Sequence, residues 1–389
     1  MKRFLLLAFT CLFLAACEGD GYIKTDSQNL VFPFEGGTQS VTITSVSEYT
    51  VTTDAKWLRI ETTGTGINVT VKRNIGGPDR TTSIVISAIN GSTTTSLAVT
   101  QESDPNCVIY YTTIDSAPIT LNSTDCFGNV GVTVISNIYE NGIGAIKLTG
   151  HVTRIGKSAF EGCRLLESIT IPETVISIEK QAFRDCQDLK SIVIPDNVIF
   201  IRESAFIDCL SLTSVTIGAK VAEIENYAFD NCQALESIII PDSVRELGER
   251  AFGSCYNLQT AVIGNRVREI KDFTFWCCTN LTDVTIGNSV MGIGESAFTK
   301  CNLTSVTIPE NVTWIGYHAF DDCKNLKSVY CKPTTPPDVY GWMFDYSVSS
   351  HEAAPIGCDI FVPSGSVSAY KAKDGWKRYS SYIKPYSFE

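Results

Sequence analysis

The sequence predicts a solenoid of short parallel strands and short helices, preceded by a small all-β sandwich. Two observations predict the solenoid: a Phe returns every 23 residues from Phe160 to Phe298, and a Cys and a Leu follow each Phe at nearly fixed offsets. A third predicts the sandwich: residues 26–102 alternate apolar and polar side chains in short runs between turn residues.

The first seventeen residues set the compartment. Met1-Lys2-Arg3 is basic, and the apolar run from Phe4 to Phe13 is too short to cross a bilayer of roughly 30 Å. Leu14-Ala15-Ala16-Cys17 resembles the bacterial lipobox, which implies a cleaved signal over residues 1–17 and lipid on the Cys17 thiol. A Cys near an ordinary cleavage point is the alternative. Glu18 and Asp20 resemble the acidic export signal of Bacteroidetes lipoproteins, which implies an outer-membrane protein exposed at the cell surface.

The charge balance excludes two classes of partner. Removal of Lys2 and Arg3 leaves 29 basic residues against 42 acids, a net charge of about −13. Such a chain is repelled by nucleic acid and by anionic lipid, so membrane attachment is expected through the N-terminal lipid only. We expect a monomer.

Residues 22–103 form the predicted sandwich. Apolar and polar residues alternate in Ser40–Thr44 and Ile67–Val71, and Asn90-Gly91 between two such runs is a hairpin signal. Phe34-Glu35-Gly36-Gly37-Thr38, Trp57-Leu58-Arg59-Ile60 and Val99-Thr100-Gln101-Glu102 are similar to the BACON domain of Bacteroidetes, which implies glycan or mucin binding. Trp57 itself is expected in the core, and the module could equally be a spacer.

The repeats occupy residues 151–332. In Ala182–Leu189 the apolar residues are three to four apart, which predicts a short helix, and Ser191–Ile194 alternates as a strand with Ile192 and Ile194 inward. A Pro or Gly then ends the strand. The Phe column comprises Phe160, Phe183, Phe206, Phe229, Phe252, Phe275, Phe298 and Phe320, and the Cys column comprises Cys163, Cys186, Cys209, Cys232, Cys255, Cys278, Cys301 and Cys323.

The Cys column is expected in the core as buried free thiols. Stacked equivalents point the same way, so they neither pair nor converge on a metal ion. Five other cysteines remain after Cys11 and Cys17 are set aside, and bridges Cys107–Cys126 and Cys331–Cys358 stay open. The fifth of these cysteines is Cys277.

The unit Ile-Gly-x-x-Ala-Phe-x-x-Cys-x-x-Leu-x-Ser-Ile-x-Ile-Pro resembles the BspA-type leucine-rich repeat of Bacteroidetes surface proteins. The resemblance covers eight repeats and implies an α/β leucine-rich-repeat solenoid. Residues 108–150 look like the N-terminal cap of such proteins and residues 333–389 like the C-terminal cap. Caps are needed because the end repeats would otherwise expose their apolar cross-section.

No catalytic motif stands out, so no enzyme activity, cofactor or metal is expected. The three histidines lack the spacing of His-Glu-x-x-His, and neither Gly-x-Ser-x-Gly nor a phosphate loop occurs. Acids at variable repeat positions, such as Glu223, Glu246 and Glu269, are expected on a solvated face.

Binding residues are sought among aromatic side chains at the variable positions. The outward strand positions are mostly small, as a flat stack requires, with Tyr330 near the end of the column. Other candidates are expected on the helix or turn side: Phe200, Tyr227, Tyr256, Trp276, Trp314 and Tyr317. Trp342, Phe344 and Tyr346 in the C-terminal segment are the candidates for sugar contact, with packing on the last repeat as the alternative.

Two functions follow as hypotheses. The BspA-type resemblance implies an adhesin-like surface protein whose solenoid binds a protein of the host or of another cell. The alternative is a surface lipoprotein that captures glycan or mucin.

Overall fold

The computed structural model describes most of the chain, namely residues 22–33, 36–72, 79–89, 93–102, 106–122, 127, 132–344 and 357–388. The chain divides into two compact units, Met1–Cys107 and Val108–Glu389. The signal peptide with Cys17, the Asn90-Gly91 turn, Cys126 and Tyr346 lie outside the described residues.

The first unit contains two four-stranded sheets, β1-β3-β6-β5 and β2-β8-β7-β4, paired antiparallel except for β2 with β8. The strands are β1 (Ile23–Thr25), β2 (Asn29–Phe32), β3 (Gly37–Ser45), β4 (Tyr49–Thr52), β5 (Leu58–Thr62), β6 (Gly66–Val71), β7 (Arg80–Ala88) and β8 (Thr94–Gln101). Val69 of one sheet and Leu97 of the other are buried in a single apolar core. Trp57 packs against that core, as predicted, and the Arg80 guanidinium lies 4.6 Å from its ring centroid.

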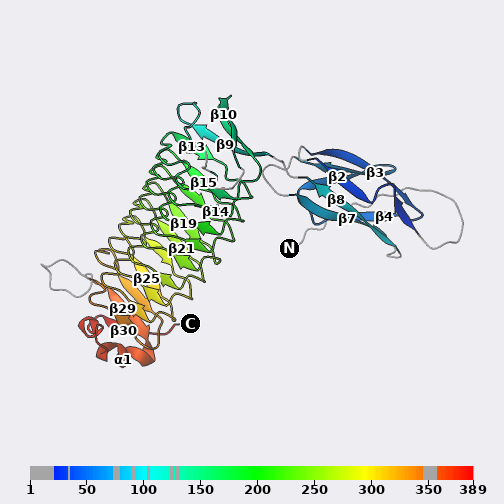
Figure 1. The fold of residues 1–389 in the computed structure, drawn as a ribbon. Helices are drawn as coiled ribbons and strands as arrows, with labels where there is room; N and C mark the ends of the chain where they lie inside the picture. The colour runs from blue at the N-terminus through cyan, green and yellow to red at the C-terminus, as the bar shows by residue number, and fades with distance from the viewer. Residues whose placement is uncertain are drawn as a thin grey trace. The chain divides into compact units, whose positions relative to one another are not determined.

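The second unit is a parallel-strand solenoid of about ten turns, here called coils, with very little helix (Figure 1). Each repeat contributes one strand to a first ladder and a shorter strand to a second ladder. The first ladder contains β13 (Leu166–Ile169), β15 (Ser191–Val193), β17 (Ser214–Thr216), β19 (Ser237–Ile240), β21 (Thr260–Ile263), β23 (Asp283–Thr285), β25 (Ser305–Ile308) and β27 (Ser328–Cys331). The second contains β12 (Arg154–Ile155), β14 (Ser177–Ile178), β16 (Phe200–Ile201), β18 (Glu223–Ile224), β20 (Glu246–Leu247), β22 (Glu269–Ile270), β24 (Gly292–Ile293) and β26 (Trp314–Ile315).

The predicted repeat helices do not form. Between the second ladder and the next first-ladder strand the chain makes turns, and two residues four apart, such as Gln181 and Asp185, have φ near +60°. Alternate amides bond to the following coil: Gln181 N–H donates to Glu203 O (3.0 Å) and Phe183 N–H to Ala205 O (2.8 Å). A helix would need those amides for bonds within its own segment. Stacking therefore overrides the helical spacing of the apolar residues.

The apolar columns form the core, as predicted. The eight Phe rings stack from Phe160 to Phe320, with neighbouring centroids 5.0–5.6 Å apart and planes within 8° of parallel. The Cys column is a row of free thiols, buried except for half-buried Cys163 at its start. One coil alone cannot bury these side chains, so the stability of each coil depends on the coils on either side of it.

The N-terminal end of the stack is closed by strands β9 (Asn106–Thr113), β10 (Val134–Glu140) and β11 (Ile143–Thr149). They form one sheet with the first repeat strand in the order β10-β11-β9-β13. Because β9 pairs antiparallel with β13, it covers the edge that the parallel ladder would otherwise leave open.

The C-terminal segment continues both ladders before it covers them. It contains β28 (Asp338–Val339), β29 (Asp359–Pro363), η1 (Ser364–Ser366), α1 (Val367–Ala372), η2 (Lys377–Tyr379) and β30 (Ile383–Tyr386). β28 extends the second ladder beyond β26, and β29 and β30 extend the first beyond β27. Tyr370, Trp376 and Tyr379 are buried against this last part of the core.

A Cys331–Cys358 bridge is excluded by strand register. The thiols of both residues are free. Asp359 pairs with Ser328, which places Cys358 opposite Lys327, four residues along the strand from Cys331. Four strand residues span roughly 13 Å, about twice the Cα separation that a disulfide bridges.

Candidate binding surface of the solenoid

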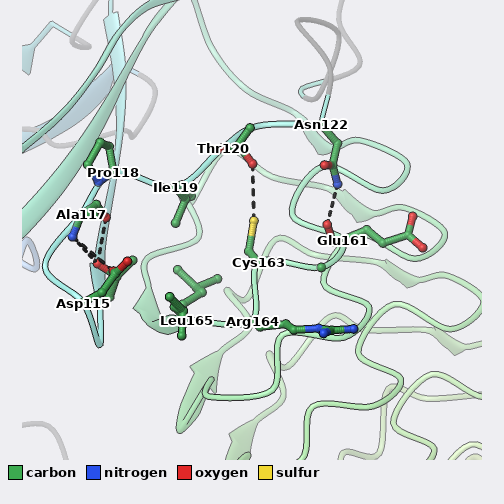
Figure 2. Close-up of a pocket in the computed structure, with 13 residues that line it drawn as sticks. Asp115, Ala117, Pro118, Ile119, Thr120, Asn122, Glu161, Cys163, Arg164 and Leu165 are labelled. Carbon is green, nitrogen blue, oxygen red and sulfur yellow. Dashed lines mark hydrogen bonds between the residues drawn. The ribbon is translucent and has the colours of Figure 1, made fainter.

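A pocket of about 320 Å³ lies between the cap loop around Pro118 and the first coil (Figure 2). Its polar groups bond across the two walls. The Cys163 thiol donates to Thr120 O (3.6 Å), and Asn122 Nδ2 donates to Glu161 O (2.6 Å). Arg164 pairs with Asp185 on the next coil at 2.8 Å. The first two contacts join the cap to the stack, and the ion pair joins the first coil to the second.

The described part of the chain contains no candidate metal centre. There, no three His, Cys, Asp or Glu side chains come together as ligands for an ion.

Three of the aromatic candidates are covered. The Arg202 guanidinium lies 4.1 Å from the ring centroid of Phe200. Trp276 has Arg250 at 4.6 Å and Lys300 at 6.0 Å from its ring. Phe344, offered by the sequence either for sugar contact or for packing on the last repeat, takes the packing role: it is 1% exposed, and its ring centroid lies 6.2 Å from that of Phe320 and 5.6 Å from that of Tyr379.

Three others are exposed or half-buried but stand apart. Tyr227 and Tyr256 are single exposed tyrosines on successive coils. Tyr330, on the outer side of β27, stacks on Phe361 of β29 with centroids 5.0 Å apart. Tyr386 of β30 meets both rings edge-on, so this group covers the end of the first ladder.

The remaining candidates gather on two adjacent coils of the second ladder. We call Trp314, Tyr317, Tyr340 and Trp342 the aromatic patch. Trp314 of β26 pairs in register with Asp338 of β28, which brings Tyr340 beside it with ring centroids 6.2 Å apart. Tyr340 is 58% exposed, Trp342 42% and Tyr317 40%, whereas Trp314 is half-buried. On these two coils three rings are exposed, whereas Tyr227 and Tyr256 are each the single exposed aromatic side chain of their coil.

Two glycines hold the rings of the patch in place. A Cβ on Gly292 would lie 2.2 Å from Trp314 Cε2, so the indole lies directly over that backbone. A Cβ on Gly341 would lie 2.2 Å from Tyr317 Cδ2, and Gly341 has φ +75°, which favours glycine. Trp342 has the Arg378 guanidinium 4.2 Å from its ring, which covers one face. Trp314 and Tyr317 are thus fixed by close backbone contact.

Sequence reasoning missed Tyr340. It treated residues 333–389 as a cap and did not align them with the repeats. Asp338-Val339 nevertheless follows Trp314-Ile315 by 24 residues and continues the second ladder. That near-repeat spacing was the signal that could have found it.

The comparisons with known proteins concern the repeats. Residues 136–218 and 199–327 match the family model described as BspA type leucine rich repeat region, in six copies. The repeat region belongs to the BspA-type leucine-rich repeat family. No curated protein matches the sequence.

Several solved structures are similar to the chain. A leucine-rich repeat protein from Bacteroides ovatus is 27% identical over 59% of this chain and 62% of its own, with a TM-score of 0.42. A leucine rich repeat protein of T. pallidum is 30% identical over 39% of this chain and 71% of its own, with a TM-score of 0.37. A leucine rich cell surface protein from Faecalibacterium prausnitzii is 24% identical over 53% of this chain and 73% of its own, with a TM-score of 0.29. The chain thus spans less than two thirds of the Bacteroides protein.

Proposed function

We propose that this chain is a non-enzymatic surface protein whose BspA-type solenoid binds a protein partner through the aromatic patch. The partner belongs to the host or to another cell. The chain is anchored in the outer membrane by lipid on Cys17 and faces outward, and the first unit holds the solenoid away from the membrane.

The single observation that carries this proposal is the cluster of half-buried Trp314 with exposed Tyr317, Tyr340 and Trp342 on adjacent coils. Trp and Tyr are the residues most enriched among those that dominate protein interfaces, because each buries a large apolar area while ordering few torsions. The glycine contacts order the Trp314 and Tyr317 rings in advance, so binding costs less conformational entropy. Trp314 lies in β26 and Tyr340 follows β28, and these two strands are paired in the second ladder.

The surface location is supported by two kinds of observation. The N-terminal sequence has the lipobox pattern, and one similar solved structure is described as a cell surface protein. The described residues contain no helix long and apolar enough to cross a membrane.

The glycan alternative has less support in the C-terminal segment than the sequence suggested. Phe344 is in the core, and Arg378 covers one face of Trp342. Tyr346 lies outside the described residues. The first unit offers no better aromatic platform in its described part, because Trp57 packs against the core under Arg80.

The test is a binding screen of the purified full chain against two panels, one of host matrix and serum proteins and one of glycans. We expect at least one protein to bind, and the Trp314→Ala/Tyr340→Ala variant to lose at least tenfold in affinity, since interface Trp and Tyr truncations commonly cost about 2 kcal/mol or more. Tyr256→Ala is the matched control, because Tyr256 is as exposed as Tyr317 (40% each) but stands alone. Binding to glycans only, through the first unit, would overturn the proposal.

A further inference from the structure

Acidic side chains border the aromatic patch on the side of the preceding coils. Glu269 of β22 pairs in register with Gly292, and Gly292 pairs with Trp314. Because the Trp314 indole lies over Gly292, it reaches back toward Glu269. Glu295 occupies the position of Tyr317 one coil earlier, as the bond from Ser296 N–H to Tyr317 O indicates. Both glutamates are exposed.

Three cations near the patch already have partners. Lys271 pairs with Glu246 at 3.3 Å and Lys373 with Asp338 at 2.8 Å. Arg378 lies over Trp342. Glu269 and Glu295 form no ion pair within the described part of the chain, and the nearest cation in sequence is Arg268, which precedes Glu269. The border of the patch therefore carries two carboxylates that no ion pair of the described chain occupies, with the Arg268 guanidinium next to Glu269 in sequence.

The exposed faces of the aromatic rings carry a negative electrostatic potential, as the two carboxylates do. The π-face of Trp or Tyr is the negative pole of the ring quadrupole and attracts ammonium and guanidinium groups. This solenoid already uses that attraction on Phe200, Trp276 and Trp342, where its own cations cover the rings. Among the described residues, Trp314, Tyr317 and Tyr340 have no such cation.

We propose that the aromatic patch, with Glu269 and Glu295 at its border, binds a lysine- or arginine-bearing peptide segment of the partner protein. This rests on the proposed function and names the chemistry of the partner. The cationic heads lie over the open faces of Trp314 and Tyr340 and pair with the two glutamates, and the aliphatic stems pack along the rings. A neutral sugar would also hydrogen-bond to the two carboxylates, so the maltohexaose competitor is needed to distinguish it from a cationic segment. An acidic or anionic partner would be repelled.

The test measures dissociation constants of labelled hexa-arginine, hexa-lysine and hexa-glutamine peptides for the full chain by fluorescence anisotropy, with maltohexaose as competitor. We expect the two cationic peptides to bind, hexa-glutamine not to bind, and affinity to fall as NaCl is raised. Trp314→Ala and Glu269→Gln/Glu295→Gln should each weaken binding about fivefold or more. Removing the nearby cation, Arg268→Gln, should leave binding unchanged or tighten it.

A matched control separates the patch from general attraction to an acidic chain. Glu173→Gln/Glu236→Gln removes the same charge from exposed positions on other coils and should change affinity less than twofold. Equal weakening by both double variants would overturn the inference, as would binding insensitive to Trp314→Ala or no binding of cationic peptide. If a protein from the screen still binds through Trp314 and Tyr340 in those cases, the proposed function stands and only the cationic partner is excluded. Displacement by maltohexaose would overturn both.

Discussion

The repeated cysteines act as hydrogen-bond donors as well as packing groups. The Cys186 thiol donates to Phe160 O on the preceding coil at 3.2 Å, and the later cysteines repeat the contact up to Cys323 with Phe298 O at 3.1 Å. Burial raises the pKa of the Cys209 and Cys232 thiols well above the usual value. They therefore stay protonated, which is the state in which a thiol can donate.

This pKa direction predicts resistance to alkylation. In the native protein at pH 8, iodoacetamide should leave Cys186 through Cys323 of the column unmodified, because these sulfur atoms are buried. For Cys186, Cys209, Cys232, Cys278, Cys301 and Cys323 the raised pKa also keeps the thiol from forming the reactive thiolate. Half-buried Cys163 should react first. Mass spectrometry of peptides before and after denaturation checks this. Rapid native labelling of Cys209 or Cys232 would contradict the account.

The sequence predicted these thiols to be buried and free, but it could not predict their acceptor. The acceptor lies 26 residues away in the chain and is brought near only by stacking. The exposure of an aromatic side chain is equally hard to predict from the sequence. Phe200 and Trp314 occupy the same repeat position, yet Arg202 lies over Phe200 whereas no cation of the described chain lies over Trp314. Arg250, one coil before Trp276, covers that ring. Which ring stays open therefore depends on side-chain placement within a coil and on contacts between coils.

The turn segment of each repeat is the element that sequence periodicity misassigned. Spacings of three and four between apolar residues fit a helix, but they also fit two turns in which left-handed residues such as Gln181 and Asp185 reverse the chain. The strand pattern was easier to assign, because alternation has one structural meaning: Ile192 and Ile194 are buried, and Val193 between them is exposed.

A pair of glycine substitutions distinguishes turn from helix. Gln181→Gly should leave the free energy of unfolding within about 0.5 kcal/mol of the parent, since relief of the left-handed conformation offsets the entropy of glycine. Gln187→Gly, at a residue of the same type without positive φ, should cost about 0.5–1 kcal/mol. Chemical denaturation measures both. An equal loss of unfolding free energy in the Gln181→Gly and Gln187→Gly variants would favour a helix.

The Phe stack is the element that fixes coil spacing. Phe229 lies between Phe206 and Phe252, with ring centroids at 5.0 and 5.3 Å, and is fully buried. Phe229→Ala should therefore destabilise the solenoid by about 3–5 kcal/mol, and Phe229→Leu by clearly less, because leucine fills most of the cavity. Denaturant titration gives both values. A loss below about 1 kcal/mol for the alanine variant would show that the stack is not a main source of stability.

At the scale of the whole molecule, the solenoid is a one-dimensional array closed at both ends. Each coil contacts its neighbours, β9 pairs with the first repeat strand, and β29 with β30 extends the last. The repeats and the existence of caps follow from the sequence because periodic columns imply stacking. The second ladder cannot be predicted from the sequence, because its two-residue strands are too short to show an alternating pattern. For this reason the sequence identified only part of the aromatic patch.

The array predicts that one internal coil can be removed. Deletion of residues 219–241, one full repeat of 23 residues, should give a folded, less stable protein that retains binding, because the patch lies on later coils. Deletion of residues 357–389 should instead expose the core beside β27 and cause aggregation. Size-exclusion chromatography and thermal unfolding check both variants. An unfolded coil-deletion variant would contradict the modular account.

The central claim, that binding occurs at the aromatic patch, is tested most directly by hydrogen–deuterium exchange of the full chain with and without a protein that it binds. The account predicts new protection in residues 291–295, 314–318 and 338–342, and little change along β15, β17 and β19. Protection confined to the outer side of the first ladder, or to residues 22–102, would contradict it.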